Sequence, residues 1–184
     1  MTIEHWEIAS SSRINFTVRH LLISKVHGRF SRWSGTVLVP DGDWSRATVE
    51  VLIDASSIDT GIAKRDADLR SANFLDVERY PAITFRSLRL IPGQADSLRI
   101  VGPLTMKGRV RQVTLEAKRS ERARFSASAA IRRRDFGASG NVGWDKYGIM
   151  IGERIDIEIE VEAVRPVAAI SSLSDIQDLM VTRA

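Results

Sequence analysis

The chain has 184 residues, no cysteine, 27 basic and 23 acidic side chains, and a formal net charge of +4. This is an ordinary length for one domain, and folding a chain of this size buries roughly 70% of its unfolded surface, so neither a metal nor a disulfide is needed for stability. The absence of cysteine excludes disulfides, thiolate catalysis and zinc–thiolate sites.

The N-terminal segment, residues 1–12, contains neither a basic region nor an apolar run of signal-peptide length. No apolar run elsewhere in the sequence approaches the ~20 residues that a helix needs to span a bilayer. We therefore expect a cytoplasmic protein.

Alternation of apolar and polar residues with a period of two dominates the chain and predicts half-buried strands of an antiparallel sheet. Turn sequences such as those at 40–43, 92–94 and 106–108 separate several of the runs. Gly28 and Gly35 lie inside one long run, where glycine is typical of a bulge or a barrel corner. The expected strands span residues 4–9, 12–20, 26–39, 46–54, 82–91, 96–104, 109–119, 122–134 and 149–164.

Two segments depart from this pattern. Residues 60–71 have helical spacing and predict a short helix between two central strands. After Pro166, apolar residues again follow a helical stripe, so we divide the chain into a domain at 1–165 and a tail at 166–184. The tail could pack on the domain, form a homodimer contact or remain loose.

The succession of strands along the chain predicts an all-β fold, an eight-stranded antiparallel barrel, because a meander of this length removes its two edges by closing. A barrel of this size is either filled by its own side chains or just wide enough for one small ligand. The presumed inward set mixes large residues such as Phe16 and Phe85 with small ones such as Ala117, Ala127 and Ala129. This mixture fits a solid core and a cavity equally well.

The sequence contains few candidates for catalysis. The three histidines, His5, His20 and His27, do not have metal-ligand spacing, and we expect no metal site. Arg65 and Asp66 form an adjacent charge pair on the predicted helix. No phosphate-binding loop, dinucleotide fingerprint or nucleophile elbow is present, and nothing assembles a nucleophile, a base and an orienting group.

The excess of basic residues comes from arginines scattered through the strand-like runs. Such a pattern is typical of a solvated outer face with mixed charge, and it also allows transient contact with an anionic membrane surface or an acidic partner. Specific binding of nucleic acid is not expected, because no basic block carries interleaved aromatic residues and no recognition helix is visible.

Several strings, in order along residues 4–164, resemble the YceI-like family of lipocalin-like barrels, which bind polyisoprenoid and other amphiphilic long-chain molecules. Two positions depart from the family pattern: Ser11 stands in a region that often carries an Asp and a His, and Asp68 replaces the His of an R-D-x-H-L motif. The matching strings are INFTVRH at 14–20, VHGRFSRWSG at 26–35, SIDT at 57–60 with RD at 65–66, YPAITFRS at 80–87, GPLTMKG at 102–108, DFG at 135–137 and IGE at 151–153.

The resemblance implies a long pocket that opens at one end of the barrel and holds a lipid chain, with no catalysis and no required cofactor. It implies binding, transport or storage of an isoprenoid or other amphiphilic lipid. His20, Arg65 and Asp66 are then candidates for polar contacts near the opening. The residues expected to line the pocket are Phe16, Val18, Phe30, Val51, Ile53, Ile58, Phe74, Phe85, Leu104, Phe125 and Ile157.

Two alternatives remain open. An enzyme acting on a similar apolar substrate would need His20, Arg65 and Asp66 to converge in the pocket. A solid barrel could instead serve as an interaction module, and a cavity below about 300 Å³ would favour it, since ligand pockets usually begin near that volume.

Overall fold

The computed structural model describes residues 2–20, 24–120, 123–138, 140 and 151–166. In this part of the chain twelve strands form one sheet, accompanied by one α-helix and three short 3-10 helices. The elements are β1 (Ile3–Ile8), β2 (Arg13–His20), β3 (Ser24–Phe30), β4 (Trp33–Pro40), η1 (Trp44–Arg46), β5 (Thr48–Asp54), η2 (Ala55–Ser57), β6 (Ile58–Asp59), α1 (Ala63–Arg70), β7 (Ala82–Arg86), β8 (Arg89–Pro92), β9 (Ser97–Met106), β10 (Arg109–Arg119), β11 (Arg124–Arg132), η3 (Arg133–Phe136) and β12 (Ile151–Val164).

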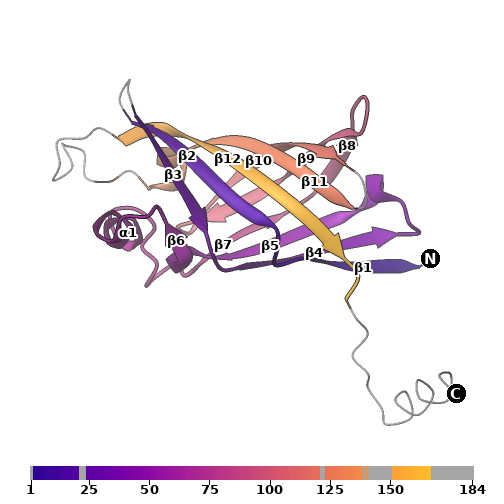
Figure 1. The fold of residues 1–184 in the computed structure, drawn as a ribbon, viewed down its shortest axis with the longest axis horizontal. Helices are drawn as coiled ribbons and strands as arrows, with labels where there is room; N and C mark the ends of the chain where they lie inside the picture. The colour runs from indigo at the N-terminus through magenta and orange to yellow at the C-terminus, as the bar shows by residue number, and fades with distance from the viewer. Residues whose placement is uncertain (1, 21–23, 121–122, 139, 141–150, 167–184) are drawn as a thin grey trace, which may run out of the picture.

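The sheet closes on itself as an antiparallel barrel (Figure 1). Its order runs β1-β4-β5-β7-β9-β10-β11-β12, and β12 pairs back onto β1. Four pairs of strands each form one bent strand of the barrel: β1 with β2, β4 with β3, β5 with β6, and β7 with β8. Beyond the bend, β2 pairs with β12 and β3, and β3 pairs with β6, while β7 and β8 both pair with β9. These four bent strands and β9, β10, β11 and β12 make eight, so the predicted eight-stranded closed barrel is confirmed.

The corner between β3 and β4 lies at residues 31–32 and divides the long strand expected at 26–39. The adjacent strand bends at the same level, where η2 separates β5 from β6. Arg32 joins the two bends, because its Nε donates to the Asp54 carboxylate at 2.9 Å and its guanidinium also donates to Ser56. The expected strand at 82–91 is likewise divided, since Ser87 pairs through its own backbone and hydroxyl with Val49.

The two glycines expected at a corner have a different role. A Cβ on Gly28 would lie 2.2 Å from the Phe16 ring, and one on Gly35 would lie 2.4 Å from Ile8. Both glycines therefore make room for a large side chain of the neighbouring strand, as glycine in a strand often does. The corner itself falls between them.

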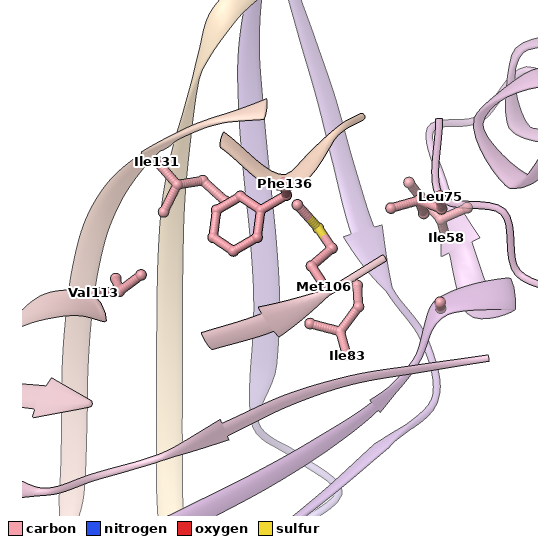
Figure 2. Packing of buried hydrophobic residues seen from close by; sticks show 8 residues of the cluster. Ile58, Leu75, Ile83, Met106, Val113, Ile131 and Phe136 are labelled. Carbon is pink, nitrogen blue, oxygen red and sulfur yellow. The ribbon is translucent and has the colours of Figure 1, made fainter. Parts of the chain in front are cut away.

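The apolar core has two centres. The larger cluster gathers Ile58, Leu75, Ile83, Met106 and Phe136 at the end of the barrel next to α1 (Figure 2). A smaller cluster around Val37 and Val39, with Trp6 and Trp44 packed against it, lies near the other end. These two centres leave the middle of the barrel to be lined by alternate inward residues.

The short helix expected at 60–71 is present as α1, which ends at Arg70 with Ser71 as its C-cap. It begins later than expected, because Thr60 donates from its backbone N–H and its hydroxyl to Asp66 and lies outside the helix. The tail at 167–184 lies outside the described residues. Within the part of the chain that is described, no helix is long and apolar enough to cross a membrane.

Candidate functional site

A cavity of about 390 Å³ occupies the inside of the barrel. Alternate residues of the strands supply its wall, such as Val113, Leu115 and Ala117 of β10 and Ile155 and Ile157 of β12. The alternation that made each strand amphipathic therefore produces an almost wholly apolar interior. The volume exceeds the 300 Å³ at which ligand pockets usually begin, which argues against a solid barrel.

The structure places every apolar residue predicted for the pocket along this wall. Their contact with a ligand stays a prediction. The residues are Phe16, Val18, Phe30, Val51, Ile53, Ile58, Phe74, Phe85, Leu104, Phe125 and Ile157.

One end of the cavity is closed by buried side chains. Phe74, Leu75, Met106 and Ala138 line it, and all four are less than 9% exposed. Behind them Phe136, at 1% exposed, ends η3 and completes the apolar plug. This end lies beside α1, at the left of the barrel in Figure 1.

Two cations hold the closed end together by donating to backbone carbonyl groups. Lys107 Nζ donates to the carbonyl oxygens of Ala72 at 2.8 Å and Gly137 at 3.1 Å. Arg133 donates to the carbonyl oxygens of Gly152 and Ala138, both at 3.0 Å. Burial lowers the pKa of the Lys107 ammonium and of the Arg133 guanidinium, because a low-dielectric surrounding disfavours the charged form.

The other end of the cavity reaches solvent. Ser45, Asp96, Ser97 and Arg119 line it and are exposed. These residues come from η1, from the start of β9 with the turn before it, and from the last residue of β10. We call this end the mouth; in Figure 1 it lies at the right, below the label of β8.

The side chain of Trp44 packs at the mouth. Its ring centroid is 5.3 Å from that of Phe125 and 5.4 Å from that of Trp6, and the Arg119 guanidinium lies 5.6 Å from it. Asp43 fixes the turn that carries Trp44, because its carboxylate accepts hydrogen bonds from the Ser45 N–H at 2.9 Å and the Ser45 hydroxyl at 2.6 Å. These bonds, with that of the hydroxyl first, hold the pKa of Asp43 below its ordinary value.

Two of the three polar residues predicted for the opening, Arg65 and Asp66, bond to Thr60 at the start of α1. Arg65 donates to the hydroxyl and carbonyl oxygens of Thr60, and Asp66 accepts from the same residue, so both side chains stabilise the start of α1. Neither is among the residues of the cavity wall. His20 is the last residue of β2, and its side chain lies outside the described residues. A ligand contact by any of the three stays a prediction.

The sequence reasoning missed the residues that form the mouth. Arg119 could have been found, because the inward alternation of Val113, Leu115 and Ala117 continues to it. Trp44 and Asp96 carried no such signal, since each belongs to a segment whose glycine and aspartate residues indicate only a turn.

The fold and the cavity together define the class: a lipocalin-like closed antiparallel barrel with an apolar interior that opens at one end. The family model of the YceI-like domain matches residues 6–163. The chain therefore belongs to the YceI-like family, as its motifs predicted.

Known proteins are similar to this chain in sequence and in fold. Protein YceI of Salmonella newport is 34% identical over 161 residues, which cover 83% of this chain and 81% of the relative. BcnA of Burkholderia cenocepacia has the same fold with a TM-score of 0.73 at 19% identity, covering 84% of this chain and 98% of that one. A polyisoprenoid-binding domain from Saccharophagus degradans aligns with a TM-score of 0.66 at 16% identity, covering 90% of this chain and all 100% of the domain.

Proposed function

We propose that this protein binds the hydrocarbon chain of an isoprenoid or another amphiphilic lipid inside its barrel and carries or stores it without chemical change. The observation that carries the proposal is the apolar cavity of about 390 Å³ with one end at the surface. The description of the Saccharophagus degradans domain as polyisoprenoid-binding supports the same class of ligand.

The energetics favour a chain-like ligand. Each methylene group that leaves water for an apolar site contributes about 0.8 kcal/mol. A wall with few polar groups offers little to a compact polar molecule, whereas a long chain gains along its whole length. The exposed residues at the mouth let a polar head group stay in contact with water while the chain is buried.

The same geometry favours binding over catalysis. Arg65 and Asp66, two of the three residues on which an enzyme mechanism would depend, are bonded to Thr60 and lie outside the cavity wall. The middle of the cavity offers apolar side chains, which can hold a substrate but transfer no proton to it.

The direct test is to denature the purified protein, extract it with organic solvent and identify the extract by mass spectrometry. We expect a long-chain lipid in a fixed ratio to protein. A protein that retains no lipid and takes none up from mixed micelles would contradict the proposal.

Phe85 offers a test of where the chain lies. It faces the cavity from β7 and is 8% exposed, so Phe85→Trp adds volume inside the barrel. We expect the variant to keep its circular dichroism spectrum and to retain several times less lipid by mass spectrometry. Thr84→Trp is the matched control, because Thr84 is the adjacent residue of the same strand and lies outside the cavity wall. Equal lipid retention by Phe85→Trp and wild type would contradict this placement.

A further inference from the structure

The mouth of the cavity carries one positive charge whose partner is aromatic. The Arg119 guanidinium lies over the Trp44 ring at 5.6 Å, and none of the described carboxylates lies within salt-bridge distance of it. Nearby arginines differ: Arg46 pairs with Asp41 at 3.8 Å, and Arg124 pairs with Glu162 at 3.4 Å. Of these three arginines, Arg119 is the one that lines the mouth, and it has no carboxylate partner among the described residues.

The position of Arg119 is fixed from two sides. Its backbone N–H donates to the Asp96 carbonyl oxygen at 2.9 Å, which joins the end of β10 to the turn before β9. Its guanidinium rests on Trp44, which itself packs against Phe125. A guanidinium stacked on an indole keeps its N–H groups free at the edge, and these groups match the paired oxygens of a carboxylate or a phosphate.

The hydroxyl groups of the mouth add little positive potential. The Ser45 hydroxyl donates to Asp43, and the Ser97 hydroxyl donates to the Gln94 carbonyl oxygen. Among the described residues of the mouth, Arg119 is therefore the strong donor. Asp96 is the acidic residue that lines the same mouth, and its charge opposes that of an anionic ligand.

We propose that the mouth is a head-group site for an acidic amphiphile, a long-chain carboxylate or phosphate whose oxygen atoms bind Arg119 while its chain fills the barrel. The inference rests on the proposed function and adds the chemical class of the head group. It predicts opposite effects at two neighbouring residues: removing the charge of Arg119 weakens binding of the acid, and removing the charge of Asp96 strengthens it.

The test compares four probes with the same chain: dodecanoic acid, dodecyl phosphate, dodecanol and dodecylamine. Their affinities for the full-length protein are measured by displacement of the neutral fluorophore phenylnaphthylamine at neutral pH and low salt. We expect both acids to bind about fivefold more tightly than the alcohol, the effect of one exposed ion pair, and the amine to bind no better than the alcohol. If one acid binds more tightly than the other, that difference identifies a carboxylate or a phosphate as the preferred head group.

The variants isolate the charge. Arg119→Gln should bind acid and alcohol equally, and Asp96→Asn should bind the acids about twofold more tightly than wild type, since a repulsion across high dielectric is small. Asp96 has φ +63°, a conformation that asparagine also adopts, so this variant keeps the turn. Arg124→Gln is the control, because Arg124 is exposed and pairs with Glu162 outside the cavity wall.

The outcomes separate the two proposals. Equal binding of acid and alcohol by wild type, or tighter binding of the amine, overturns the head-group site and leaves lipid binding intact. An unchanged acid preference in Arg119→Gln also overturns it. If no probe displaces the fluorophore and solvent extraction yields no lipid, lipid binding itself is contradicted.

Discussion

The two ends of the barrel are built in different ways. The closed end combines the buried Phe136 with cations that donate to backbone carbonyl groups, as the buried Arg133 does to Ala138 and Gly152. The mouth is held by half-exposed contacts, in which Trp44 packs against Phe125 under the guanidinium of Arg119. Buried, satisfied polar contacts are costly to break, whereas surface aromatic and cation contacts are cheap.

The closed end therefore contributes more to the stability of the fold, and the mouth is the end through which a ligand chain can enter. Opening the closed end would expose the larger core cluster and leave carbonyl groups without donors. Widening the mouth needs only that Trp44 leave its contacts with Phe125, Trp6 and the Arg119 guanidinium near the surface. Entry of a chain through the mouth can therefore proceed without unfolding the barrel, and mutations at the two ends should have different effects.

The largest expected effect is on stability at the closed end. Phe136→Ala should lower the free energy of unfolding by about 3–5 kcal/mol, since it removes a buried aromatic ring and leaves a cavity. Phe125→Ala makes the same chemical change at the half-buried mouth and should cost about 1 kcal/mol. Urea denaturation of both variants measures the difference. Equal losses would contradict the contrast between the two ends.

A smaller effect is expected at Lys107. Lys107→Met removes the donor from the Ala72 and Gly137 carbonyl groups and should cost about 1 kcal/mol by urea denaturation, because the partly buried Gly137 carbonyl group loses its partner. Lys118→Met on the outer face of β10 is the control and should change stability by less than about 0.5 kcal/mol.

Lys107 also has a pH signature. Burial lowers its pKa in the folded protein below the value of 10.5 that it has when unfolded, so the unfolded chain binds more protons between the two pKa values. Stability should therefore rise with pH through that window, and the rise should be smaller in Lys107→Met. A variant with the same pH dependence as wild type would contradict the assignment to Lys107.

The sequence predicted the wall of the cavity because strand alternation is a local property. Phe16 and Val18 of β2, or Ile157 of β12, face inward for the same reason that their polar neighbours face outward. Once the sheet closes, every inward residue reaches the same interior. The alternation does not give the volume of that interior, which depends on barrel closure and on how the side chains pack.

The mouth could not be predicted in the same way, because it depends on contacts between distant segments. Trp44 reaches Phe125 and Arg119 only after the barrel has closed. Arg65 and Asp66 show another limit: the family resemblance made them candidates for a polar opening, and it gave no sign of their bonds to Thr60, only a few residues away.

The smallest expected effect compares two capping aspartates at opposite ends of β5. Asp54 accepts hydrogen bonds from the Ser56 hydroxyl at 2.7 Å and from Arg32 at 2.9 Å, and these contacts, with that of Ser56 first, hold its pKa below the ordinary 3.8. Asp43 has the equivalent serine contact, but Arg46 lowers its pKa through its charge and its backbone N–H, whereas Arg32 bonds to Asp54 through its side chain.

Because the folded-state pKa of Asp54 is depressed, the stability that its carboxylate contributes is present above pH 3.8 and is lost as the pH falls through the folded pKa. Asp54→Asn keeps an acceptor for the Ser56 N–H but loses the charge that Arg32 binds, so stability at neutral pH should fall by about the amount that wild type loses through Asp54 on acidification, and the loss on acidification becomes shallower. Asp43→Asn should reduce the loss of stability on acidification less, since Asp43 accepts no bond from an arginine side chain. Thermal unfolding from neutral pH to below 3.8 measures both slopes, and a greater flattening in Asp43→Asn would show that the serine contact, and not Arg32, sets the acid sensitivity.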